Sequence, residues 1–134
     1  MPRPEPLRAL LVLRRIEAQS AKVRMMEAIA GQSRAEAALR SHDAALRREV
    51  CHAGGAAFAA WLPTAGEAAD RAAAALGLAT ANSVEACGAA AAATLAEKAT
   101  VQELRRQAGI RRAARLGREQ QDLDDIAQAC AAAS

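Results

Sequence analysis

The sequence predicts an all-α protein that folds as a long antiparallel two-helix coiled-coil hairpin. Alanine supplies 40 of the 134 residues. Alanine, leucine, arginine and glutamate favour helix, whereas the β-branched and aromatic residues that favour strands are scarce. Phe58 and Trp61 are the only aromatic residues, which excludes a thick core because large side chains supply most of the burial energy. Apolar residues recur at steps of three and four in both halves of the chain, as paired helices require.

The first helix is expected over about residues 7–60. Pro6 fits a first helical turn, where its missing N–H is not needed, and the next proline is Pro63. Acid-before-base pairs four residues apart, such as Glu36 with Arg40, support an exposed helical face. One apolar stripe, in which Ser20 takes an intervening position, predicts the face toward the second helix; it consists of Leu10, Leu13, Ile16, Val23, Met26 and Ala30.

The reversal of chain direction is expected at about residues 61–65. Pro63 discourages a helix from running through this stretch. Thr64 and Glu67 have the spacing of a capping box, in which each side chain satisfies a free backbone N–H at a helix start. Gly54-Gly55 is the weaker candidate, since it either ends the first helix or only weakens it. Phe58, Trp61 and Leu62 would then cluster beside the turn.

The second helix is expected over about residues 66–131, so that residues 1–134 form a single helical hairpin. The cap-like pair Asn82 and Glu85 leaves open a break near residues 78–83. The predicted contact face continues through the C-terminal part of this helix with one extra residue of offset, which changes supercoiling locally without ending a coiled coil. Its residues are Val101, Leu104, Ala108, Leu116, Leu123, Ile126 and Cys130.

The sequence predicts no catalytic, cofactor or metal site. His42 and His52 lie ten residues apart without further ligands spaced nearby. The acidic residues Asp122, Asp124 and Asp125 lack the glycine and the bidentate glutamate of a calcium loop. We therefore expect a protein that is not an enzyme and needs no cofactor.

Charge separates the two ends of the chain from its middle. The net charge is +4 over residues 1–50, −2 over 51–95 and +1 over 96–134, with both signs interleaved at the ends. A nucleic-acid binder usually has a one-sided basic excess, so no nucleic acid is expected as partner. No signal peptide or integral membrane segment is evident. The three separated cysteines suit reduced thiols, and the expected location is cytoplasmic.

The two ends also carry the most distinctive sequence. Leu7–Glu17 opens a long charged helix with two adjacent arginines, and Arg111–Ala127 is basic first and acidic afterwards. The second segment is similar to the E-x-x-x-L-D-E-x-A ending of the FliJ/YscO family, the small coiled-coil stalk proteins of flagellar and injectisome type III secretion. Length and the single-hairpin layout resemble that family too. The alanine-rich centre and Asp125, where glutamate is commoner, depart from its pattern.

The resemblance implies a mechanism. In that family a two-helix hairpin, similar to the central stalk of rotary ATPases, inserts its paired ends into the hexameric export ATPase. It promotes ATPase assembly or activity and links the ATPase to the export gate protein, and some members interact with export chaperones. The implied location is the cytoplasmic base of a membrane-embedded secretion apparatus. On this chain the expected partner-binding residues are Leu13, Ile16, Arg111, Arg115, Glu119, Leu123 and Ile126.

Two other classes of function stay open. A helical secretion chaperone or regulator would form stable complexes with a secreted protein and none with an ATPase. A peripheral membrane protein would use the basic amphipathic segment 8–24 to bind anionic lipid, although Glu17 and Glu27 interrupt its basic face.

Overall fold

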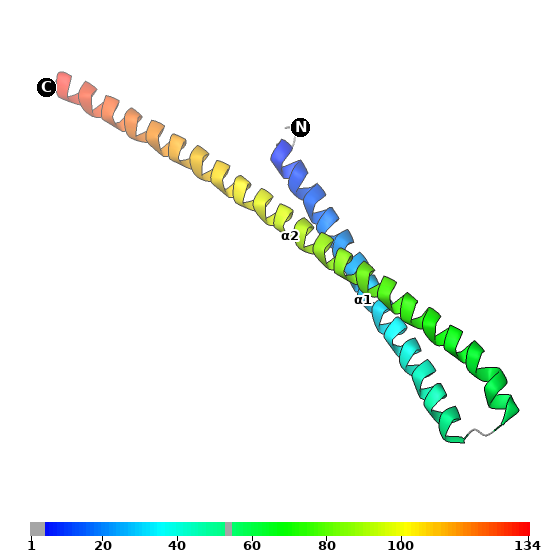
Figure 1. Ribbon diagram of the computed structural model, residues 1–134. Helices are drawn as coiled ribbons and strands as arrows, with labels where there is room; N and C mark the ends of the chain where they lie inside the picture. Colours follow the sequence, from blue (N-terminus) through cyan, green and yellow to red (C-terminus); the bar gives the residue numbers. More distant parts are fainter. Residues whose placement is uncertain (1–4, 53–54) are drawn as a thin grey trace. The chain divides into compact units, whose positions relative to one another are not determined.

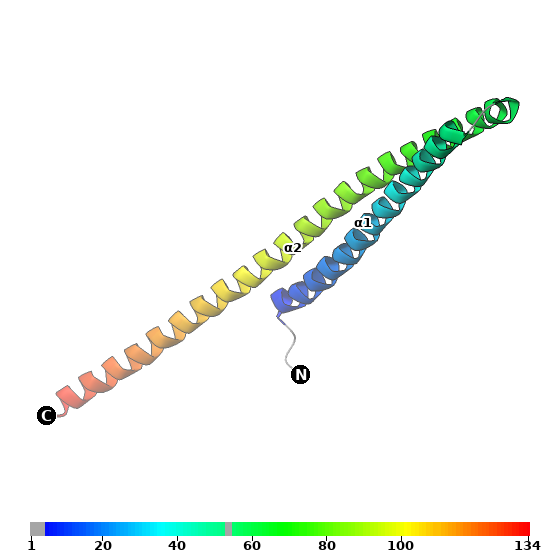
Figure 2. The same ribbon diagram turned by 90° about the horizontal axis from the view of Figure 1, so that it is seen from below.

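The computed structural model describes residues 5–52 and 55–134, and two helices account for nearly all of them. Helix α1 spans Pro6–His52 and helix α2 spans Ala56–Ala132. The helices run antiparallel (Figure 1 and Figure 2), and no strand occurs in the described residues. The predicted all-α helical hairpin is therefore confirmed.

The chain divides into two compact units, and both helices contribute to each. We call Ile16–Thr94 the turn unit, because it contains the reversal of the chain. We call Met1–Arg15 with Leu95–Ser134 the terminal unit, because it contains both chain ends.

The chain reverses earlier than predicted. Helix α1 ends at His52 and α2 begins at Ala56, so the helices are separated at residues 53–55 and not at 61–65. Gly55 has a φ of 100°, a left-handed conformation that glycine adopts without steric cost. Residues 53 and 54 lie outside the described part of the chain. A residue with this φ cannot continue a helix, so the helix break lies at Gly55 and not at the proline.

Helix α2 runs through Pro63 without interruption, so the predicted capping box of Thr64 and Glu67 does not form. Pro63 is exposed, whereas Trp61 and Ala65 on either side are half-buried. The rings of Phe58 and Trp61 contact each other within α2, with 5.9 Å between their centroids, and the helix continues although Pro63 lacks one amide hydrogen. The helix also continues through residues 78–83, where a break was left open.

The contact face of the turn unit consists mainly of small side chains. Ala18, Ala21, Ser83 and Ala90 are buried there, with at most 8% of their surface exposed. Half-buried residues extend this face at steps of three and four, on α1 at Met25, Ala28, Gln32, Ala35 and Leu39, and on α2 at Ala72, Leu76, Ala79, Ala86 and Ala93. Small residues allow two helix backbones to approach closely, so the alanine-rich sequence of α2 makes a thin interface.

The contact face predicted for α1 is wrong in this unit. Ile16 and Met26 expose 61% and 67% of their surfaces, and Val23 is exposed as well. Successive residues of the predicted stripe lie three, three and four positions apart, which is on average less than one helical turn. The stripe therefore winds about 160° around an ideal helix between residues 10 and 30. The observed face alternates steps of three and four, the 3.5-residue period that keeps a seam against a partner helix.

In the terminal unit, larger residues form the contact between the helices. Leu7, Leu10 and Leu11 of α1 are half-buried, as are Val101 and Leu104 of α2. Thr100 is buried on α2. The predicted contact residues Leu10, Val101 and Leu104 therefore lie at the interface, in contrast to those of the turn unit.

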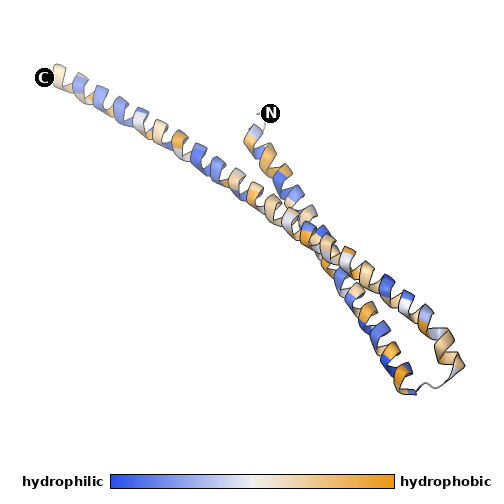
Figure 3. Cartoon of the chain, in the orientation of Figure 1, coloured by the Kyte–Doolittle hydropathy of each residue, from blue (hydrophilic) through white to orange (hydrophobic). Residues whose placement is uncertain are grey.

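Beyond this contact, every residue from Ala108 to Ser134 is exposed. In both views α2 continues past the beginning of α1 (Figure 1 and Figure 2). Hydrophilic residues dominate this part of α2 and apolar positions recur among them (Figure 3). The predicted continuation of the contact face at Ala108, Leu116 and Leu123 is wrong, since α1 does not cover these residues. We call residues 108–132 the C-terminal segment.

Candidate partner-binding site

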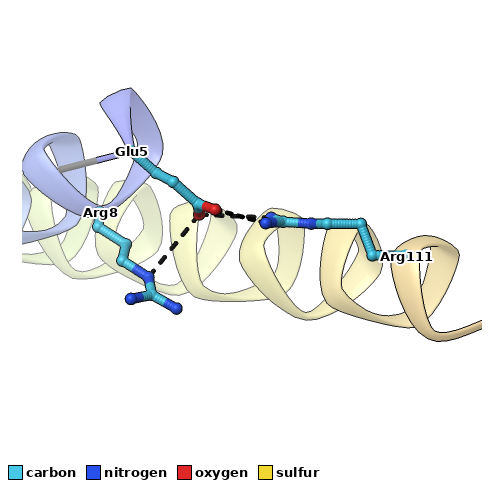
Figure 4. A network of polar contacts seen from close by, with 3 residues as sticks. All are labelled: Glu5, Arg8 and Arg111. Carbon is cyan, nitrogen blue, oxygen red and sulfur yellow. Dashed lines mark hydrogen bonds and ion pairs between the residues drawn. The ribbon is translucent and has the colours of Figure 1, made fainter. Parts of the chain in front are cut away.

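The terminal unit joins the start of α1 to α2 through an ion pair (Figure 4). Arg111 donates hydrogen bonds from both terminal guanidinium nitrogens to the two carboxylate oxygens of Glu5, and the bond from Nη2 to Oε2 measures 3.3 Å. The Nε atom of Arg8 lies 3.7 Å from Glu5 Oε2. One carboxylate therefore lies between two arginines, one on each helix.

This arrangement changes the acidity of Glu5. Hydrogen bonds from Arg111 hold the pKa of the Glu5 carboxyl below its ordinary value; desolvation opposes them less strongly, and the charges of Arg111 and Arg8 add to the lowering. The same pair raises the pKa of Arg111. Within α2, hydrogen bonds from Arg106 likewise lower the pKa of Glu103, which lies one turn before Arg106. Both carboxylates are therefore ionised at neutral pH.

A second ion pair connects the helices nearer the turn unit. Arg15 Nε lies 3.7 Å from Glu97 Oε1. Together with the Glu5–Arg111 pair it fixes the register of α1 against α2 in the terminal unit. Neither pairing was predicted from the sequence, because opposite charges on different helices can be matched only when the register of the helices is known.

An open hollow of about 740 Å³ lies where α1 begins, and its lining is mostly basic. Its charged residues are Glu5, Arg8, Arg105, Arg111, Arg112, Arg115 and Arg118; Leu104, Ala108 and Ala114 complete the lining. Arginine presents a planar fork that binds carboxylates with two parallel hydrogen bonds, as Arg111 does with Glu5. This surface is chemically suited to an acidic protein segment.

The structure brings together some of the predicted partner-binding residues and separates others. Arg115 and Glu119 lie one turn apart on α2, with Nε 3.9 Å from Oε1. Leu123 and Ile126 each expose 60% of their surface further along the same helix. Leu13 is half exposed on α1 in the terminal unit, whereas Ile16 belongs to the turn unit. Six of the seven residues thus share one unit.

The described residues contain no group of three or more histidine, cysteine or acidic side chains placed to hold a metal ion. Cys51 and Cys130 are exposed free thiols, and Cys87 is a half-buried free thiol. In the part of the chain that the structure describes, neither helix carries an apolar stretch sufficient to cross a membrane.

No family model matches this chain, and no curated protein or solved structure is similar to it. The resemblance to the FliJ/YscO family rests on the residues quoted for it from the two ends of the sequence.

Proposed function

We propose that this protein is a non-enzymatic central-stalk component of a bacterial type III secretion system. Its paired helix ends dock into the hexameric export ATPase, promote the assembly or activity of that ATPase and couple it to the export gate protein. The observation that carries the proposal is the part of the C-terminal segment beyond Arg111, which presents large apolar and charged side chains that are all exposed.

The exposed apolar residues of this segment support a protein partner. Leu116, Leu123 and Ile126 expose 50%, 60% and 60% of their surfaces. Burying such side chains against a partner removes apolar surface from water, which is the main favourable term in most protein associations. The buried core of the turn unit, in contrast, is made of small side chains and offers no comparable gain.

The charges of the terminal unit support a partner that is itself charged. The C-terminal segment is basic from Arg111 to Arg118 and acidic from Glu119 to Asp125, and Arg115 and Glu119 form only a long ion pair with each other. Complementary charges contribute mainly to partner choice and to the rate of association. A stalk that enters a ring of identical ATPase subunits requires this kind of recognition at its end.

The test is binding and stimulation of the export ATPase by the purified full chain. The variant Arg111→Glu/Arg115→Glu/Glu119→Arg is expected to weaken ATPase binding at least about tenfold, since like charges would then face each other. The control is Arg40→Glu/Arg47→Glu in the turn unit, where both arginines are exposed and the net charge changes by more than in the terminal variant. This control is expected to bind and stimulate like the parent chain.

Three outcomes would overturn the proposal: no binding of the parent chain, unchanged binding of the terminal variant, or equal losses in terminal variant and control. A stable complex with a secreted protein but none with the ATPase would favour the chaperone alternative. Binding to anionic vesicles that salt reverses, without ATPase binding, would favour the peripheral membrane alternative.

A further inference from the structure

The hollow where α1 begins, which we call the basic hollow, has a large excess of positive charge. Six arginines line it, together with the single carboxylate of Glu5. Two of these arginines share Glu5, and Arg115 lies 3.9 Å from Glu119. The arginines that have no acidic partner among the described residues are Arg105, Arg112 and Arg118. The basic hollow therefore keeps unused capacity to bind an anion.

Glu5 indicates which kind of anion this surface accepts. Its carboxylate receives hydrogen bonds from both terminal nitrogens of Arg111 (Figure 4). The backbone N–H groups of Arg8 and Ala9 donate to the carbonyl oxygen of Glu5, over 2.9 and 3.2 Å, so the first turn of α1 holds Glu5 beside the hollow. An arginine that binds one carboxylate through two N–H groups can bind another in the same way.

The contact between Glu5 and Arg111 is open to competition. Their side chains expose 40% and 55% of their surfaces, and ion pairs with this degree of exposure contribute little stability. A ligand with several carboxylates would also engage the arginines that have no acidic partner. Such a ligand can therefore displace Glu5 from Arg111.

The length of the basic hollow and the charges beyond it favour a short ligand. From Arg105 to Arg118, α2 rises about 20 Å at about 1.5 Å per residue, which an extended segment of about six residues covers at about 3.3 Å each. After Arg118 the helix is acidic, at Glu119, Asp122, Asp124 and Asp125. A long polyanion or an anionic bilayer that continued along α2 would meet like charges there. A short acidic protein segment would not.

We propose that the basic hollow binds a carboxylate-rich protein segment of about six residues, and that Glu5 is an internal competitor for this segment. Glu5 occupies Arg111 until the segment displaces it, so the beginning of α1 regulates access to the hollow. Arg111 and Arg115 are also proposed docking residues for the ATPase. Assigning the segment to the ATPase therefore rests on the proposed function, whereas binding of the segment does not.

The test is binding of a fluorescent hexaglutamate peptide to the purified full chain at low salt, without any ATPase. Arg105→Gln/Arg112→Gln removes two arginines of the hollow and is expected to weaken binding about fivefold. Arg40→Gln/Arg47→Gln is the matched control, because these exposed arginines of the turn unit have the same spacing and the same change of net charge. The control is expected to bind the peptide like the parent chain.

A second pair of variants tests the competition by Glu5. Glu5→Gln removes the internal carboxylate and is expected to tighten peptide binding about threefold. Glu49→Gln changes the net charge equally at an exposed position of the turn unit, and it is expected to leave the affinity unchanged. In the parent chain, the peptide is expected to move the carboxyl carbon resonance of Glu5 toward its position in Arg111→Gln.

Circular dichroism of each variant checks that the helices persist. The proposal would be overturned if the parent chain bound anionic vesicles but not the peptide, or if both arginine variants lost equal affinity. Equal affinity of Glu5→Gln and Glu49→Gln would overturn the role of Glu5. A chain that binds the peptide as expected but not the export ATPase would count against the proposed function alone.

Discussion

The α2 side of the turn unit's contact face and the C-terminal segment belong to the same helix, yet they use its sequence in opposite ways. In the turn unit, Ser83 and Ala90 are buried although their side chains are small. In the C-terminal segment, Leu123 and Ile126 remain exposed although their side chains are large. The difference shows that burial in this chain follows the presence and spacing of a partner helix and not hydrophobicity alone.

Amide hydrogen exchange is expected to give the largest contrast between these regions. An isolated helix is marginally stable in water, whereas opening of packed helices requires sub-global unfolding. At a concentration where the chain is monomeric, amides of residues 112–130 are expected to exchange roughly 100-fold faster than those of residues 79–100. Similar protection in both regions would contradict the comparison.

Pro63→Ala tests how much the beginning of α2 depends on packing. The substitution restores an amide donor and removes a ring from the helix interior, so it is expected to raise the free energy of unfolding by up to about 3 kcal/mol. Thermal unfolding followed by circular dichroism measures it. Pro6→Ala is the control, because proline at a first helical position costs no hydrogen bond. A destabilising effect of Pro63→Ala would mean that the proline fits a local bend.

Ala18→Leu compares the two regions with one substitution. Ala18 is 1% exposed, and the added volume is expected to force the helices apart and lower the free energy of unfolding by about 1–3 kcal/mol. The same change at the exposed Ala129 of the C-terminal segment is expected to stay within about 0.5 kcal/mol. Denaturant unfolding measures both variants. An equal effect at both positions would remove the distinction between packed and unpacked helix.

Glycine replacements examine backbone stability without changing contacts. A Cβ atom built on Gly77, Gly88, Gly109 or Gly117 meets nothing within 4 Å. Alanine at Gly77 or Gly88 is expected to raise the free energy of unfolding by about 0.5–1 kcal/mol each. Alanine at Gly109 or Gly117 is expected to stabilise the helix locally, which would appear as slower amide hydrogen exchange in the C-terminal segment. Gly55→Ala is the opposing control, since φ of 100° strains an alanine.

The Glu5–Arg111 pair gives the smallest expected effect, because the side chains of Arg111 and Glu5 expose 55% and 40% of their surfaces to water. The folded-state pKa of Glu5 lies below its ordinary value. The pair therefore contributes stability that is complete above the unfolded pKa and is lost as the pH falls through the folded pKa. An NMR titration of the Glu5 carboxyl measures this, and Arg111→Ala is expected to return the pKa toward the ordinary value. An unchanged pKa in that variant would exclude Arg111 as the cause.

The element types were predictable from the sequence, whereas the turn and the contact faces were not. Alanine, leucine, arginine and glutamate favour helix wherever the chain packs, so two long helices follow directly. Pro63 and the Thr64–Glu67 spacing are strong local signals, yet α2 runs through both. The apolar stripe through Ile16, Val23 and Met26 was predicted to face the second helix. Its spacing is shorter than the 3.5-residue period that keeps one face of a helix against a partner helix, so the stripe winds away from α2.

Part of the candidate site was likewise predictable from the sequence, and part of it was not. Arg115, Glu119, Leu123 and Ile126 were proposed as partner-binding residues from the family resemblance and the apolar and charged pattern near the end of the chain, and all four are exposed. Glu5, which binds Arg111, was missed because 106 residues separate the two. Only the register of α1 against α2 brings them together, and no pattern within either helix encodes that distance.

The sequence by itself determined that this protein is helical, thin in its core and rich in charge at its ends, because helix propensity and side-chain size are properties of single residues. The tertiary structure decided where the chain reverses, which face of α1 is buried, and that Glu5 pairs with Arg111. These features depend on the register of two helices, and the register results from all contacts along the hairpin acting together.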